Sequence, residues 1–125
     1  MDGGTNAATG KVMTIPNSQI SVDDNNGSFN TGFSSIIRCG NIIIINIGGS
    51  NISAGLNHQR YLYNLPKCAK QSFAPIYDFN YGGMVGYLRM EEGETNIYAT
   101  TIPGYSNTSA VTMQMIYPTE EGGGA

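Results

Sequence analysis

Glycine, asparagine and proline interrupt this chain so often that only short apolar runs are left between them. These runs consist largely of Ile, Val, Thr, Tyr and Phe, the residue types that are enriched in β-strands. No ten-residue window without Gly and Pro shows the apolar spacing i, i+3, i+4 and i+7 of an amphipathic helix. The pattern therefore predicts an all-β fold with almost no helix.

The chain has 125 residues, the length of a single domain. We expect residues 1–10 to form a flexible N-terminal segment, residues 11–118 the all-β domain and residues 119–125 a disordered tail. The expected strands cover residues 11–15, 17–22, 33–39, 41–48, 59–63, 73–79, 84–90, 96–101 and 111–117. Roughly seven to nine strands at this spacing favour a small antiparallel β-sandwich or barrel.

Side-chain alternation assigns the faces of these strands. In the strand 59–63, Tyr61 and Tyr63 are expected on one face, and in the strand 84–90 Val85, Tyr87 and Arg89 share a face. The run Ile42–Ile47 is different, because it is apolar on both faces apart from one asparagine. Such a strand is expected either in the centre of a sandwich or against a neighbouring subunit.

The charge balance excludes two classes of partner. Six basic and nine acidic residues give a net charge of -3, and the isoelectric point is near 4.8. A nucleic-acid or anionic-lipid surface is recognised by a basic field, which this composition does not supply. No apolar run approaches the ~20 residues that span a bilayer. We therefore expect neither nucleic acid nor a membrane among the partners.

The sequence shows no arrangement typical of a metal or cofactor site. His58 is the only histidine, so a metal site based on several histidines is excluded. Cys39 and Cys68 form no C-x-x-C motif, and two free thiols are favoured over a single disulfide. We expect no metal and no cofactor.

The carboxylates do not indicate an enzyme. Glycoside hydrolysis requires two acids about 5–9.5 Å apart in different environments. Glu91, Glu92 and Glu94 share one predicted hairpin tip, where all three would be solvated. Asp78 is the only acid among aromatic residues, and capping of backbone amides in a turn is favoured over a ligand role there. We therefore expect a non-catalytic protein.

The composition is better suited to binding. Eight tyrosines and no tryptophan, together with many Asn and Ser residues, are typical of surfaces that recognise polar ligands. Residues 57–63 and 77–81 each combine aromatic rings with polar side chains. Most of the tyrosines, five or six of the eight, are expected in the core. The candidate ligand-binding residues are His58, Arg60, Tyr61, Tyr77, Asp78, Asn80, Tyr81 and Arg89.

Several short motifs occur in an order that resembles a known family. They are FSSIIRCGNIIIIN at residues 33–46, Leu65-Pro66, GYLR at 86–89, a Glu-Gly turn, NIYAT at 96–100 and a last strand ending in Tyr117. In this order, over roughly residues 30–118, the chain resembles the C-terminal head domain of tail-fibre and baseplate receptor-binding proteins of tailed phages that infect Gram-positive bacteria.

The resemblance implies a jelly-roll-like head that assembles as a parallel homotrimer at the tip of the virion tail. It implies reversible binding of a host cell-wall saccharide or teichoic acid, contacts with other virion tail or baseplate proteins, and an extracellular location after release. Such heads often use a tryptophan in the receptor pocket. In this chain Tyr61, Tyr77 and Tyr81 are expected to stack on the ligand instead, with hydrogen bonds from His58, Arg60, Asp78, Asn80 and Arg89.

Other functions remain open at this stage. A capsid-decorating or head-fibre protein would use the same fold to bind other virion proteins. A polysaccharide-degrading tail enzyme would need two facing carboxylates. A bacterial carbohydrate-binding module or surface adhesin would explain the tyrosines without a virion.

Overall fold

The computed structural model describes residues 12–16, 19–106 and 110–120, and the expected flexible segment 1–10 lies outside this part of the chain. The described residues form nine β-strands and no α-helix, which confirms the all-β class. The strands are β1 (Val12–Ile15), β2 (Ser21–Val22), β3 (Ser35–Cys39), β4 (Ile42–Ser50), β5 (Gln59–Tyr63), β6 (Ser72–Asp78), β7 (Gly83–Met90), β8 (Ile97–Thr101) and β9 (Val111–Pro118).

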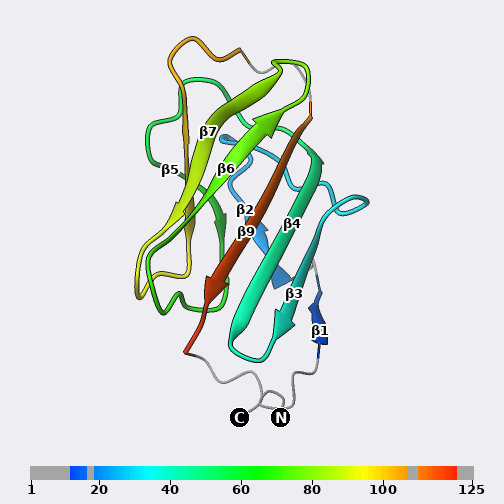
Figure 1. Ribbon diagram of the computed structural model, residues 1–125, viewed down its shortest axis with the longest axis vertical. Coiled ribbons are helices and arrows are strands. Elements are labelled where there is room, and N and C mark those ends of the chain that lie inside the picture. The colour runs from blue at the N-terminus through cyan, green and yellow to red at the C-terminus, as the bar shows by residue number, and fades with distance from the viewer. Residues whose placement is uncertain (1–11, 17–18, 107–109, 121–125) are drawn as a thin grey trace.

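All nine strands belong to one antiparallel sheet with the order β1-β3-β4-β9-β6-β7-β8-β5-β2. The sheet curls into a half-barrel. Strands β3, β4 and β9 lie side by side in one half of the sheet, and β6 and β7 lie side by side in the other half (Figure 1). The two halves are joined where β9 pairs with β6, over only three residue pairs from Ile76 to Asp78. The two edge strands, β1 and β2, follow each other along the chain.

The core fills the concave side of this sheet. In β6 and in β9 every second residue is buried, as expected for strands with one face on the core and one in water. The buried apolar side chains of all the longer strands form one cluster. Pro75, which cannot donate a ladder hydrogen bond, lies in the part of β6 that β9 does not pair with.

The isoleucine strand β4 buries only one of its two apolar faces within the chain. Ile43, Ile45 and Ile47 are in the core. Ile42 and Ile44 point to the convex side, where Ile42 is 40% exposed. The register places Ile44 between Ile37 of β3 and Ile116 of β9, and Ile116 is 50% exposed. We call the convex residues Val12, Ile37, Ile42, Ile44 and Ile116 the aliphatic face.

Two β-bulges change the faces expected from strict alternation. The register of β5 shifts between Arg60 and Leu62, so that both Tyr61 and Leu62 are buried, whereas Tyr63 is only partly buried. The register between β6 and β7 shifts as well, and Val85 is buried next to Gly86. The expectations that Tyr61 shares a face with Tyr63, and Val85 with Tyr87, are therefore wrong. One extra residue in a strand reverses the alternation beyond it.

Two further expectations concern the C-terminal boundary of the domain and the two cysteines. Thr119, expected in the disordered tail, is buried and forms a bridge with Cys68, so the ordered domain extends past residue 118. Residues 121–125 of the expected tail lie outside the described part. Cys39 and Cys68 do not form a disulfide, as favoured from the sequence.

We predict that Gly86→Ala destabilises the protein by about 2–3 kcal/mol. A Cβ at position 86 would lie 2.1 Å from the backbone oxygen of Thr100 and 2.9 Å from the Cα of Thr101, so the backbones of β7 and β8 would have to separate. Urea unfolding measures the change. Gly83→Ala on the same strand is the control, because a Cβ there has no neighbour within 4 Å. Equal stability of the two variants would contradict the prediction.

Candidate ligand-binding face

The convex side of β5, β8, β7 and β6 carries a row of alternating cationic and aromatic side chains. Arg60 of β5 pairs with Tyr98 of β8, Tyr98 pairs with Arg89 of β7, and Arg89 pairs with Phe73 of β6. The Arg89 guanidinium lies 5.9 Å from the centre of the Phe73 ring. It also forms an ion pair with Glu91. Four strands thus present planar rings and charged donors on one surface, which we call the binding face.

A second row lies beside the first. Thr100 pairs with Tyr87, and Tyr87 pairs with Pro75. His58 joins this row because its backbone N–H donates to the Thr100 Oγ1 atom at 3.0 Å. The His58 ring stacks on Tyr98, with 4.4 Å between ring centres and 11° between planes. The backbone of His58 has a φ of 55°, which Asn and His tolerate better than branched residues.

A shallow hollow of about 390 Å³ lies on the part of the binding face that β6 and β7 form. It is lined by Phe73, Ala74, Pro75, Met84 and Tyr87. Phe73 and Met84 are each 57% exposed, which is unusual for large apolar side chains. The Phe73 and Tyr87 rings are 6.3 Å apart and tilted by 54°. The hollow therefore offers apolar contact and ring surfaces to whatever binds there.

The turn from β6 to β7 is organised by one buried carboxylate. Asp78 is fully buried, and its Oδ1 atom accepts the backbone N–H groups of Asn80 at 2.9 Å and Tyr81 at 3.2 Å. Its Oδ2 atom accepts the Tyr105 hydroxyl at 2.8 Å. The Tyr105 and Tyr81 rings meet edge to face. Asp78 thereby fixes a turn whose rings at Phe79 and Tyr81 stay exposed.

Burial, the hydrogen bond to Asp78 and the charge of that carboxylate raise the pKa of Tyr105 to about 12. Burial also raises the pKa of Tyr61, whose hydroxyl donates to the carbonyl of Ser28 at 2.5 Å. A tyrosine with a raised folded-state pKa stabilises the fold below its unfolded pKa of about 10. That contribution is lost as the pH rises from about 10 towards 12.

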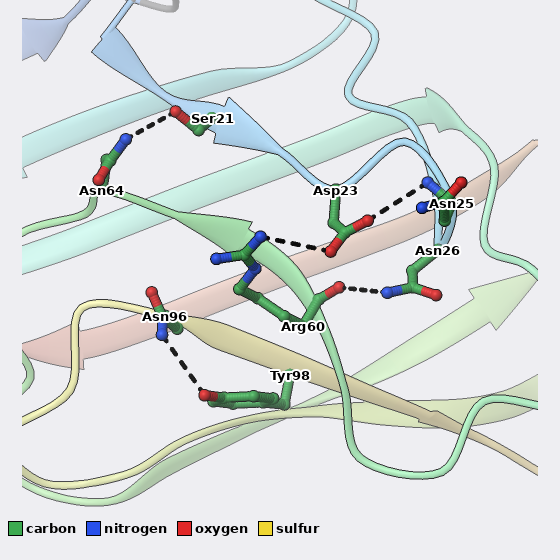
Figure 2. Close-up of polar contacts among 8 residues, drawn as sticks. All are labelled: Ser21, Asp23, Asn25, Asn26, Arg60, Asn64, Asn96 and Tyr98. Carbon is green, nitrogen blue, oxygen red and sulfur yellow. Dashed lines mark hydrogen bonds and ion pairs between the residues drawn. The ribbon is translucent and has the colours of Figure 1, made fainter.

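The other margin of the binding face is a polar cluster around β2 and β5 (Figure 2). The Nη2 atom of Arg60 lies 3.5 Å from the Oδ2 atom of Asp23. The guanidinium lies 3.8 Å from the centre of the Tyr63 ring. The Asn26 amide donates to the Arg60 carbonyl at 2.7 Å, and the Asn96 amide approaches the Tyr98 hydroxyl at 3.4 Å. Amides, a carboxylate and rings therefore lie within one short stretch of surface.

The structure brings most of the predicted binding residues to this surface. His58, Arg60, Arg89 and Tyr77 belong to its strands or their immediate flanks, and Tyr77 is 39% exposed. Asn80 and Tyr81 are exposed on the turn at one end of it.

Two predicted binding residues are corrected. The ring of Tyr61 is fully buried by the bulge in β5, so it offers no stacking surface to a ligand. Asp78 is fully buried and caps the turn, so its role is structural, as the turn-capping interpretation held. Fewer tyrosines lie in the core than expected: three of the eight, Tyr61, Tyr105 and Tyr117, are buried.

Sequence reasoning missed four aromatic members of the binding face: Phe73, Tyr63, Tyr87 and Tyr98. Alternation alone would have placed Phe73 and Tyr98 outward, since their strands contain no bulge before these residues. The position of Tyr63 depends on the bulge in β5. No sequence pattern marks that bulge.

Within the described residues, no group of three or more His, Cys, Asp or Glu side chains could hold a metal ion. No helix in the same part of the chain is long and apolar enough to cross a membrane. Comparisons with protein-family models, curated proteins and solved structures found no match to this chain.

We predict that Asp78→Ala lowers the free energy of unfolding by about 2–4 kcal/mol, because two backbone N–H groups and a buried hydroxyl lose their acceptor. The same variant should lower the pKa of Tyr105 from about 12 and weaken the loss of stability above pH 10. Chemical denaturation and pH titration of tyrosine ¹³Cζ resonances measure the two effects.

Asp24→Ala is the matched control for this carboxylate, because Asp24 is exposed. We expect it to change stability by less than about 0.5 kcal/mol. An Asp78→Ala variant as stable as Asp24→Ala would show that the turn does not depend on the buried carboxylate.

Proposed function

We propose that this protein is a non-catalytic receptor-binding head of a phage virion, located at a tail-fibre or baseplate tip, that attaches to a glycan on the host cell surface. The observation that carries the proposal is the binding face, on which exposed rings alternate with arginine, histidine and amide groups across four strands. The ligand class is a cell-wall saccharide or teichoic acid of a Gram-positive host, as the family resemblance implies.

The chemistry of the binding face suits a saccharide. Sugar rings have apolar C–H surfaces that stack on aromatic rings, and hydroxyls that need fixed hydrogen-bonding partners. Tyr87 and Phe73 supply the rings beside the hollow. Arg60 and His58 lie at the polar margin, where Asp23 holds the guanidinium in position.

The state of the carboxylates supports binding without catalysis. Asp23 and Glu91 are engaged by Arg60 and Arg89 respectively. Asp78 is buried, and its carboxylate accepts hydrogen bonds from the backbone of the β6–β7 turn and from the Tyr105 hydroxyl. These three carboxylates are already engaged within the protein, which supports the proposal of a non-catalytic binding head.

We further propose that three copies associate through the aliphatic face. That face lies on the opposite half of the sheet from the binding face, on β1, β3, β4 and β9. Its isoleucines would be shielded from water around a three-fold axis, and the three binding faces would remain open. This arrangement gives the second apolar face of β4 a place to be buried.

A second candidate function is a structural virion protein that decorates the capsid or a head fibre. The apolar lining of the hollow favours it, because exposed Phe and Met side chains are typical of protein–protein contacts. In that case Phe73 and Met84 would contact another virion protein, and glycan would not bind.

We predict that Tyr87→Ala and Tyr98→Ala each weaken glycan binding about 5- to 30-fold, since a lost ring contact costs about 1–2 kcal/mol. The measurement is binding to an array of purified wall polysaccharides and teichoic acids from Gram-positive bacteria, followed by competition with host adsorption. Phe33→Ala is the control, because Phe33 is 74% exposed but lies outside the binding face. No binding to any wall polymer, or equal losses in all three variants, would contradict the proposed function.

We predict that the pure chain sediments as a particle of about three times 13.3 kDa at micromolar concentration. Ile116→Lys should shift it to the monomer, because a charge would enter the aliphatic face. Met84→Lys, which places the same charge on a similarly exposed residue of the binding face, should leave the trimer intact. A wild-type monomer under these conditions would contradict the proposed assembly.

A further inference from the structure

A separate pocket of about 360 Å³ lies at the gap between the two edges of the sheet. One wall comes from β1 and β3, and the other from the residues that flank β2 and follow β5. Its lining consists of Met13, Ile15, Gln19, Ile20, Arg38, Asn64, Leu65 and Pro66. None of these residues belongs to the binding face.

Arg38 is the only charged residue among the described residues of this lining. The register pairs it with Met13 of β1 and with Ile43 of β4, and Ile43 is a core residue. The Arg38 side chain therefore lies on the concave side of the sheet. Its Nε atom donates to the carbonyl of Gly40 at 3.0 Å.

The Nη2 atom of Arg38 is buried and has no hydrogen-bond acceptor among the described residues. The other two arginines each pair with a carboxylate, Arg60 with Asp23 and Arg89 with Glu91. No described carboxylate pairs with Arg38. The guanidinium is thus satisfied at Nε, through Gly40, but not at Nη2. A buried donor atom without an acceptor is costly, and a partner that supplies oxygen atoms would remove that cost.

The other lining residues indicate the chemical character of that partner. Ile15, Ile20 and Leu65 supply apolar surface. The Asn64 amide donates to the hydroxyl of Ser21 at 2.7 Å (Figure 2), which orients this side chain. A cation beside apolar walls suits a small molecule with an oxyanion at one end and a short aliphatic part at the other.

We propose that this pocket binds a small organic anion, a carboxylate or phosphate on a short aliphatic stem, through the guanidinium of Arg38. Because Nε already donates to Gly40, the two Nη groups of Arg38 are the donors left for an oxyanion. Two Nη groups can donate a parallel pair of hydrogen bonds to a carboxylate or a phosphate, so both head groups share the same recognition chemistry. The stem contacts Ile15, Ile20 and Leu65. This site is independent of the glycan-binding function proposed above, and either can fail without the other.

The experiment titrates the full chain with hexanoate, hexyl phosphate, inorganic phosphate and hexanol, and follows the Arg38 Nε–Hε resonance by NMR. Hexanoate and hexyl phosphate should bind at about millimolar concentration or below. Phosphate alone should bind more weakly, because it lacks the stem. Hexanol should not shift the Arg38 resonance. The relative affinities of hexanoate and hexyl phosphate identify which head group the pocket prefers.

Variants separate the pocket from general charge effects. Arg38→Gln should weaken hexanoate binding about tenfold or more. Lys70→Gln removes the same charge from an exposed residue outside the lining and should leave binding unchanged. If Arg38→Gln does not fold, Arg38→Lys keeps the charge without the two-pronged donor and should still bind more weakly. Equal binding of hexanol and hexanoate, no response of the Arg38 resonance to either anion, or equal losses in Arg38→Gln and Lys70→Gln would overturn the proposal.

Discussion

The pairing of β9 with both β4 and β6 is the constraint on which the rest of the structure depends. On one side β9 follows β4 along nearly its whole length, and on the other it meets β6 over only three residue pairs. The sheet can therefore curl at this junction and enclose one core with its concave side. Asp78 lies at this junction, opposite Val111, so the residue that fixes the β6–β7 turn also lies where the two halves meet.

The curl divides the convex surface into two chemically different halves. On β1, β3, β4 and β9 the outward positions at one end of the sheet are mainly isoleucine and valine, which make no directional contacts. Polar residues follow towards the other end, where the Gln114 amide donates to Asn46. On β5 to β8 the outward positions carry rings, arginines and hydroxyls, which make directional contacts. Aliphatic surface suits burial against a copy of itself, and mixed surface suits a ligand that exchanges with water. The division of roles that we propose follows from this difference.

Much of the fold could be predicted from the sequence because apolar alternation and turn residues act locally. The strand 59–63 was predicted with its observed bounds, and most others within one or two residues. The faces of Tyr61 and Val85 could not be predicted, because a bulge depends on the partner strand rather than on the residue itself. The close approach of Gly86 to Thr100 is likewise a contact between distant segments.

The candidate site was predicted in part for the same reason. Arg60, Arg89 and Tyr77 could be identified as polar or aromatic residues on short strands. The row of side chains from Arg60 to Phe73 could not be predicted, because it depends on the order of β5, β8, β7 and β6 in the sheet.

The register also shows which elements lie at each end of the sheet. Val12 and Pro118 lie at the end of the sheet formed by the β3–β4 hairpin, and the turn after Asp78 lies at the other. If the domain were anchored through either of these strand ends, the opposite end of the sheet, with the exposed rings of Phe79 and Tyr81, would be farthest from the anchor.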